Sequence, residues 1–229
     1  MSNLASMNKI DSLRDQVYAY LRDKMESGSL LPGAAVDLNE ISKELSISKT
    51  PLRDAMIRLE AEGFVKIWPR RGIIVNRLDL EDIRYLYEII GALEGAMVCS
   101  AFDKFDELVL ARMDAFNAEM RTALAKDDLT AYSIAHWAFH DIFLELSQNL
   151  LVKRIITPIK HQIWEFPRRG FSREWDTMAC NEHQAITTAI RNGELNEATR
   201  IIRDLHWGFS YNEKFIRRVY FYEKISQVG

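Results

Sequence analysis

The fold of the N-terminal part is decided by residues 31–75, which read LPGAAVDLNEISKELSISKTPLRDAMIRLEAEGFVKIWPRRGIIV. Asp37, with Glu40 three residues later, is typical of the capped start of a short helix. A further helix is expected to begin at Ser48 or Thr50, because either side chain can act as an N-cap. The stretch therefore predicts two short helices joined by a tight connection.

The residues on either side extend this pattern. Residues 64–67 and 73–75 read as two short strands joined by a turn. Upstream, apolar residues recur at helical spacing until Gly28, which can end a helix in the left-handed conformation. They are Ile10, Leu13, Val17, Tyr20 and Leu21. Three short helices followed by a two-stranded hairpin predict a winged helix-turn-helix.

The rest of the chain is helical in texture, and no second sheet is evident. A helix is expected from residue 80, and further helices are expected at residues 104–126, 128–147, 149–166, 174–191 and 194–222. We therefore predict a mainly α protein with two domains, a winged helix over residues 1–77 and an all-α helical bundle over residues 78–229.

Charge and cysteine content narrow the class of protein. The net charge of -3 divides unequally: residues 1–77 hold 12 Lys and Arg against 10 Asp and Glu, or +2, and residues 78–229 hold 18 against 23, or -5. Cys99 and Cys180 lack a metal-type or redox-type spacing. Because no apolar run approaches the roughly 20 residues that span a bilayer, we expect a cytoplasmic protein with no membrane partner.

One face of the helix after Ser48 is predicted to bind DNA. Its apolar stripe leaves the first turn polar; the stripe consists of Leu52, Ala55, Met56 and Leu59. DNA contacts are expected from Ser48, Lys49, Thr50 and Arg53, and from Arg70, Arg71 and Gly72 in the wing turn. A helical hairpin with a solvated charged face is the alternative on periodicity alone.

The amino-acid sequence of residues 31–75 resembles that of the GntR family of bacterial regulators. The matching pattern is P-G, S-x-T-P-x-R-x-A, L-x-x-E-G and the R-G of the wing. The resemblance implies that the recognition contacts fall on the residues named above, with Arg71-Gly72 at the wing tip. Lys49 stands where Arg is more usual, Ala35 where many members have a DNA-contacting Arg, and Ser46 where a turn Gly is usual, so the operator sequence does not follow from the family.

Four histidines have spacings that suit one metal ion. His136 and His140 lie one helical turn apart, so both can face a single ion. His183 lies ten residues before Gly193 and His206 thirteen after it, so a helical hairpin that turns at this glycine brings them level. Packed core histidines are the alternative interpretation, and His161 is interpreted as a surface or packing residue.

Residues 80–220 resemble the FCD effector domain of the FadR-type branch of the GntR family, through HWAFHDIFLELSQN, EHQAITTAIRNGELNEA and the later His206. The resemblance implies that a divalent transition metal, Zn or Ni, binds to an Asp and three His and holds an effector carboxylate. Here His136 takes the place of the Asp. Nitrogen-rich ligation favours Zn, Ni, Cu or Fe over Mg or Ca, and a neutral imidazole makes the site more positive, which suits an anionic effector.

The effector itself stays unidentified. Ile90 occupies a position at which the FCD resemblance implies an Arg, so the effector is more apolar or its anchor comes from elsewhere, with Arg154, Arg168 and Arg169 as candidates. Five aromatic residues can line a pocket or simply fill the core: Trp137, Trp164, Phe166, Trp175 and Trp207.

Together these features predict a homodimeric, ligand-responsive transcription regulator rather than an enzyme. We expect a repressor that binds a pseudo-palindromic double-stranded operator and responds to a small organic acid. A metal-dependent hydrolase is one alternative, but no H-E-x-x-H pattern accompanies the histidines. An architectural DNA-binding dimer with a structural metal site is the other.

Overall fold

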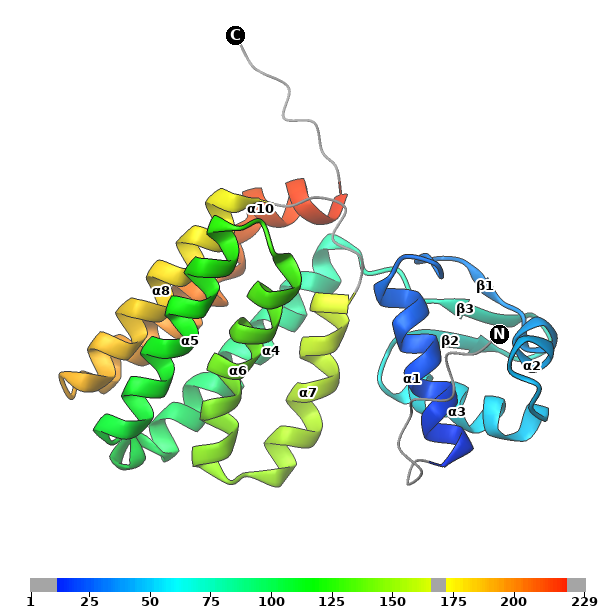
Figure 1. Cartoon of the computed structure of the whole chain (residues 1–229), viewed down its shortest axis with the longest axis horizontal. Coiled ribbons are helices and arrows are strands. Elements are labelled where there is room, and N and C mark those ends of the chain that lie inside the picture. The colour runs from blue at the N-terminus through cyan, green and yellow to red at the C-terminus, as the bar shows by residue number, and fades with distance from the viewer. Residues whose placement is uncertain (1–11, 166–171, 222–229) are drawn as a thin grey trace, which may run out of the picture. The chain divides into compact units, whose positions relative to one another are not determined.

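The protein is described from a computed structural model that covers residues 12–165 and 172–221. The chain divides into two compact units (Figure 1). The first contains the residues up to Asp79 together with the segment from Pro158 to Glu165, and the second contains the other described residues from Leu80 on.

The N-terminal unit is a winged helix, as the sequence predicts. Its elements are α1 (Leu13–Glu26), β1 (Ala35–Val36), α2 (Leu38–Leu45), α3 (Lys49–Ala61), β2 (Val65–Trp68) and β3 (Gly72–Val75). The strands form an antiparallel sheet in the order β1-β3-β2. Ile10, which the sequence assigned to the first helix, lies outside the described residues.

The sheet has one strand more than predicted. In β1, Ala35 pairs with Ile74 and Val36 with Ile73. The Gly33 amide also donates to the Val75 carbonyl over 2.9 Å, which ties the preceding turn to the wing. A strand of two residues is too short to produce an alternating pattern of apolar residues, so periodicity could not reveal it.

Capping fixes where α2 begins and ends. The Asp37 carboxylate accepts hydrogen bonds from the backbone amides of Asn39 and Glu40, as expected for an N-cap. At the other end Ser46 has φ of 55°, in the left-handed region that usually favours glycine. This is the position where the GntR pattern has a turn glycine, so the backbone conformation is kept without the residue that suits it best.

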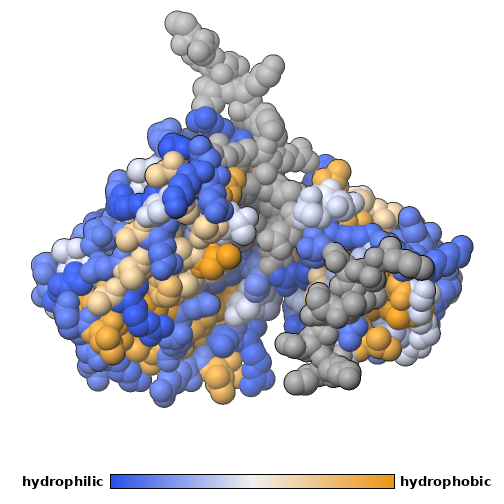
Figure 2. Space-filling model, in the orientation of Figure 1, coloured by the Kyte–Doolittle hydropathy of each residue, from blue (hydrophilic) through white to orange (hydrophobic). Residues whose placement is uncertain are grey.

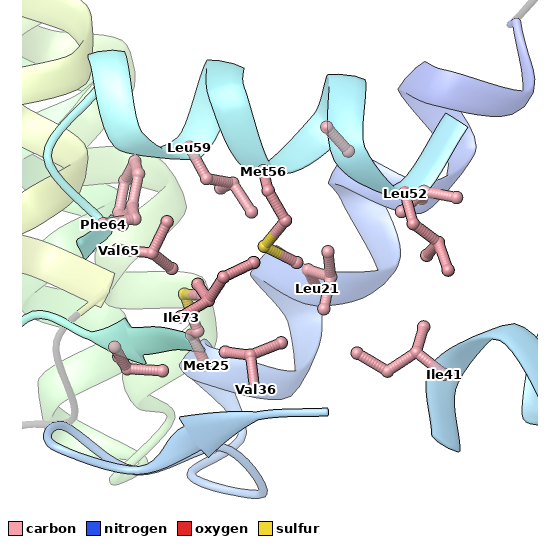
Figure 3. Packing of buried hydrophobic residues seen from close by; sticks show 13 residues of the cluster. Leu21, Met25, Val36, Ile41, Leu52, Met56, Leu59, Phe64, Val65 and Ile73 are labelled. Atoms are coloured by element: carbon pink, nitrogen blue, oxygen red, sulfur yellow. The ribbon is translucent and has the colours of Figure 1, made fainter. Parts of the chain in front are cut away.

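The core of the N-terminal unit lies between α1, α3 and the sheet (Figure 3). Leu21 and Met25 of α1 face Met56 of α3, and Ile73 reaches the same cluster from β3 (Figure 3). The predicted apolar stripe of α3 is confirmed, because its four residues, Leu52, Ala55, Met56 and Leu59, are all buried. Burying this stripe turns the opposite face of α3 toward solvent.

The second unit is helical in all its described residues. Its elements are α4 (Leu80–Ser100), the short 3₁₀ helix η2 (Phe102–Lys104), α5 (Glu107–Ala125), α6 (Leu129–Ser147), α7 (Leu150–Glu165, whose last turns group with the first unit), α8 (Arg173–Arg191), α9 (Leu195–Arg200), the π-helix η3 (Ile201–His206) and α10 (Phe209–Phe221). Helix α5 packs against α6 and α8, and α4 packs against α6 and η3. Within the described residues no helix combines the length and the apolar character needed to cross a membrane.

The single long helix predicted for residues 194–222 is wrong. The chain forms α9, widens into η3, turns at Trp207–Gly208 and starts again as α10. A Cβ on Gly208 would lie 2.0 Å from the Asp204 carbonyl oxygen, so this close turn requires glycine. The predicted helix at residues 104–126 also begins later, because the Asp106 side chain caps α5 at the Val109 amide. Residues 166 and 222, at the ends of two predicted helices, lie outside the described ranges.

Candidate functional site

The solvent-facing side of α3 carries the polar residues predicted to read DNA. Lys49 and Arg53 are both exposed and lie one helical turn apart. Ser48 and Thr50 are also exposed, at the start of the same helix. The buried stripe of α3 thus leaves one cationic, hydroxyl-bearing face at its N-terminal end, the end from which a helix contacts base edges and phosphates.

Ser48 differs from the other N-cap residues of this unit. The side chains of Ser12 and Asp37 accept a backbone amide hydrogen bond at the start of their helices, whereas Ser48 occupies the N-cap position of α3 without such a bond. Its hydroxyl is therefore not engaged in capping. The first amides of a helix have no partner within the helix, so this end of α3 presents donors that suit a phosphate oxygen.

The wing places two further cations in solvent. Arg70 and Arg71 lie in the turn between β2 and β3, Gly72 is the first residue of β3, and all three are exposed. Arg70 and Gly72 have φ of 63° and 103°, so a tight turn presents the two guanidinium groups at the wing tip. Trp68 beside them is 40% exposed, and Lys66 Nζ lies 4.5 Å from the centre of its ring. This tip has the composition expected of a phosphate or minor-groove contact.

The four histidines singled out in the sequence meet inside the second unit. His136 and His140 come from α6, His183 from α8 and His206 from the last position of η3. One nitrogen of each ring lies within 4.8 Å of the corresponding atoms of the other three. All four rings are buried: His140 and His183 are 0% exposed, His136 is 3% and His206 is 7%. His140 Nε2 lies 3.1 Å from His206 Nε2 and 3.2 Å from His183 Nε2.

Two buried carboxylates that the sequence analysis missed adjoin this histidine cluster. Glu94 of α4 lies with Oε2 at 2.9 Å from His140 Nδ1, and the same oxygen accepts a 2.7 Å hydrogen bond from Trp207 Nε1. Glu182 of α8 lies with Oε2 at 2.9 Å from His206 Nδ1. The cluster therefore consists of four imidazoles and two carboxylates.

A sequence signal for Glu94 existed. It occupies the buried face of α4, where Ile83, Tyr87, Ile90 and Met97 also lie, so an acid interrupts an otherwise apolar stripe. Charged residues are almost never fully buried unless they are paired. An acid at such a position indicates a buried partner, although only the structure identifies that partner as His140.

Burial keeps His183 neutral. Its pKa lies well below the usual 6.5, first because the ring is removed from water and then because His206 and His140 lie beside it. A neutral imidazole has the lone pair that a metal ligand needs. At neutral pH, His183 is therefore in the state required for coordination.

Two of the nitrogen spacings in the cluster match those of ligands around a transition metal. Ligands about 2.0–2.1 Å from an ion are about 3.0 Å apart at right angles and about 3.4 Å apart in a tetrahedron. The observed Nε2 to Nε2 separations of 3.1 and 3.2 Å fall within that interval. The four histidines could thus hold one divalent metal ion, and their nitrogen donors suit Zn or Ni better than Mg or Ca.

The residues considered as effector contacts have different surroundings. Ile90 is fully buried in α4, and Arg154 is exposed. Trp207 is buried with its ring centre 5.0 Å from that of His206, whereas Trp175 stacks on Phe215 in the core. Trp137 is half-buried beside His136. Arg168, Arg169, Phe166 and the side chain of Trp164 lie outside the described part of the chain.

His161 is a packing residue, as interpreted from the sequence. It is partly buried, and its Nδ1 lies 2.8 Å from a guanidinium nitrogen of Arg22 in the N-terminal unit, to which both residues belong. Burial and this cation lower its pKa to about 4, so the ring is neutral at pH 7.

Two protein families match consecutive parts of the chain. The "Bacterial regulatory proteins, gntR family" match covers residues 13–75, and the FCD domain match covers residues 85–206, just over half of the chain. The first range contains the winged helix. The second begins in α4 and ends at His206, so it includes the complete histidine cluster.

Individual proteins agree with these matches. An HTH-type transcriptional regulator from the TAR-I ttuE-ttuC' intergenic region of Agrobacterium vitis is 36% identical over 129 residues, 54% of this chain and 74% of the relative. The HTH-type transcriptional repressor RspR of Escherichia coli is 24% identical over 194 residues, 83% of this chain and 85% of RspR. A solved GntR transcriptional regulator from Rhodococcus sp. RHA1 shares the fold with a TM-score of 0.70 at 20% identity, covering 90% of this chain and 98% of that one. The chain therefore belongs to the GntR family of bacterial regulatory proteins and carries an FCD domain: it is a DNA-binding transcription regulator and not an enzyme.

Proposed function

We propose that this regulator is a homodimeric repressor whose FCD domain binds one divalent metal ion, Zn or Ni, and a small carboxylate effector that changes operator affinity. The observation that carries the proposal is the buried cluster of four histidines in the domain that follows the winged helix. The repressor role is supported by the E. coli relative, which is named a repressor. In this proposal residues 1–77 bind DNA and residues 78–229 bind the effector.

The DNA contacts are assigned to two exposed sets of residues. We assign a bidentate contact with guanine to Arg53, and contacts with phosphates or neighbouring base edges to Lys49, Ser48 and Thr50, all of which are exposed. The wing turn with Arg70, Arg71 and Gly72 is assigned to the phosphate backbone or the minor groove. One winged helix reads only a short half-site, so specificity calls for two copies on a pseudo-palindrome.

The metal ligands are assigned to His136, His140, His183 and His206. When bound, a divalent metal supplies a Lewis-acidic centre to which a carboxylate oxygen can bind if a coordination position stays open. From the sequence, the neutral imidazole of His136 in place of the family's Asp predicts a more positive metal site. Glu94 and Glu182 offset that charge, so recognition of a carboxylate depends on direct bonding rather than on an excess of positive charge.

Several large apolar side chains of the second unit are exposed. Figure 2 shows hydrophobic residues scattered among hydrophilic ones on the visible face of this unit. Large exposed examples are Leu108 of α5, Ile134 of α6, and Leu150 and Leu151 of α7. Scattered apolar side chains are normal on a protein surface, so the proposed dimer rests on the need for two half-sites and not on these residues.

The test uses the full-length protein. Operator DNA is first selected from a random duplex pool, and binding is then measured with and without Zn²⁺ and a panel of di- and tricarboxylic acids. We expect an enriched pseudo-palindrome and at least one acid that lowers the affinity only when metal is present. Failure to enrich any sequence would refute operator recognition.

The coordination number separates two versions of the proposal. A closed four-coordinate site would make the metal structural, as in an architectural DNA-binding dimer, whereas a five- or six-coordinate site leaves room for an effector oxygen. Absorption spectra of the Co²⁺-substituted protein distinguish the two. An intense four-coordinate spectrum that no carboxylate alters would contradict effector binding at the metal.

A further inference from the structure

Glu94 and Glu182 each lie within hydrogen-bond distance of a histidine of the cluster, and both are buried. Glu94 is 0% exposed and Glu182 is 7% exposed. Neither is one of the metal ligands assigned above. Burying a carboxylate is costly unless it is paired and hydrogen-bonded, so both need a balancing charge.

We propose that Glu94 and Glu182 are positioning residues of the metal centre. Each holds one histidine in the tautomer that turns its Nε2 lone pair toward the cluster, and together they balance the charge of a divalent ion. The inference rests on the metal site proposed above, and it adds the residues that orient the ligands.

The direction of the hydrogen bonds fixes the tautomer. An ionised carboxylate only accepts, so the Nδ1 atoms of His140 and His206, each 2.9 Å from a carboxylate oxygen, must donate. A neutral imidazole has one N–H, which leaves Nε2 of both rings without a proton. Two such lone pairs 3.1 Å apart repel each other, and a cation between them removes the repulsion.

Trp207 strengthens the case for Glu94. An indole Nε1–H can only donate, and it donates to the same Glu94 oxygen that lies beside His140 Nδ1. The indole therefore identifies this oxygen as a hydrogen-bond acceptor, independently of the histidine. Because Trp207 directly follows His206, Glu94 also ties α4 to the turn that carries another ligand.

The two carboxylates match the charge of a divalent metal ion. A histidine that binds a metal through a nitrogen lone pair adds no charge to the site, so two carboxylates, at -2, would balance a divalent ion. A neutral total lowers the cost of keeping the ion in a buried site. Partners of this kind, hydrogen-bonded to ligand histidines, change metal affinity by about 10- to 100-fold when they are removed.

The test compares Glu94→Gln and Glu182→Gln in the full-length protein. Glutamine has nearly the same shape and its carbonyl can still accept from Nδ1, but the negative charge is lost. Glu88→Gln on α4 and Glu174→Gln on α8 are matched controls, because both residues are exposed. Zn²⁺ affinity is measured by competition with a chelator, and the melting temperature is measured without metal.

We expect each cluster variant to bind Zn²⁺ at least tenfold more weakly, while the controls stay within twofold of the wild type. The metal-free melting temperature should not fall, because removing an uncompensated buried charge does not destabilise the apo protein; a merely structural role would lower it. A loss of less than tenfold overturns the role of that residue. If the wild type itself binds no Zn²⁺, the proposed metal site falls too, which distinguishes the two failures.

A measurement on the wild type covers the case in which a variant does not fold. Long-range ¹H–¹⁵N spectra of the Zn²⁺-loaded protein report which nitrogen of each histidine carries the proton. His140 and His206 should be protonated at Nδ1 and metal-bound at Nε2. Coordination through Nδ1 of either ring would overturn the inference.

Discussion

Asn212 holds together the turn that presents His206, and Asn212→Ala is expected to destabilise the second unit. Its Oδ1 accepts a 2.7 Å hydrogen bond from Trp175 Nε1. Its Nδ2 donates to the carbonyls of Leu205, Gly208 and His206, over 2.7, 3.0 and 3.2 Å. The residue is 1% exposed, so these bonds are made away from water.

The expected loss in the free energy of unfolding follows from the groups that lose the Asn212 amide as a hydrogen-bond partner. The carbonyls of Leu205 and Gly208 each also accept a backbone amide, so their loss is partial. The Trp175 indole loses a buried bond of 2.7 Å and the His206 carbonyl loses one of 3.2 Å, and a buried group deprived of its partner costs about 1–3 kcal/mol. We expect a total of about 2–4 kcal/mol, because a water molecule can enter part of the vacated space.

Thermal unfolding followed by circular dichroism checks this value. For a domain of this size the loss corresponds to a melting temperature lower by about 4–16 °C. Asn196→Ala, at an exposed position of α9, is the control and should stay within about 0.5 kcal/mol. Zn²⁺ affinity should fall as well, since His206 lies in this turn. A loss of less than 1 kcal/mol for Asn212→Ala would refute the view that this amide organises the turn.

Four further predictions concern DNA, assembly, metal and pH. Arg53→Ala should weaken operator binding by about 1–3 kcal/mol in fluorescence anisotropy with the fold intact, and an affinity within twofold of the wild type would show that α3 does not read bases. Light scattering at micromolar concentration should give a dimer, free and on DNA; a monomer under both conditions contradicts the proposal. Elemental analysis should find about one equivalent of Zn or Ni per chain, and replacing His140 and His183 together by alanine should abolish it; wild-type protein that carries no metal and gains no thermal stability from Zn²⁺ or Ni²⁺ would leave only packed histidines. The pKa of His183 in the folded protein lies well below 6.5, so below that pH the unfolded chain binds a proton that the folded protein does not. The free energy of unfolding should therefore be unaffected by His183 above pH 6.5 and should fall as the pH is lowered, by up to about 1.4 kcal/mol per pH unit. Urea denaturation of metal-free protein at pH 7.5, 6.5 and 5.5 should show a slope that His183→Gln reduces, and an unchanged slope would be the opposing result.

The winged helix was accessible from the sequence because its signals are local. The apolar stripe of α3, the Asp37 cap and the glycine at the end of α1 each act within a few residues, and all three occur in the structure. The strand β1 was not accessible. Two residues pair with β3 across nearly 40 positions of sequence, and so short a segment has no periodicity of its own.

The histidine cluster was predictable only in part. His136 and His140 share a helix face because of their spacing, and the turn at Gly193 does bring His183 and His206 together. The prediction of one continuous second helix failed, because η3 and the turn at Gly208 depend on the Asp204 carbonyl and the Asn212 side chain. Contacts of this kind leave no helical or strand periodicity in the sequence, so the sequence pattern could not predict this turn.

The sequence by itself determined the two folding patterns, the family resemblance and the identity of the four histidines, because periodicity, capping and motifs are carried by neighbouring residues. Only the tertiary structure decided that Glu94 of α4 and Glu182 of α8 sit against His140 and His206. Glu94 and His140 are 46 residues apart in sequence, and their contact depends on how α4 packs against α6. Helix packing, rather than any local pattern, therefore brought two carboxylates against the histidine cluster.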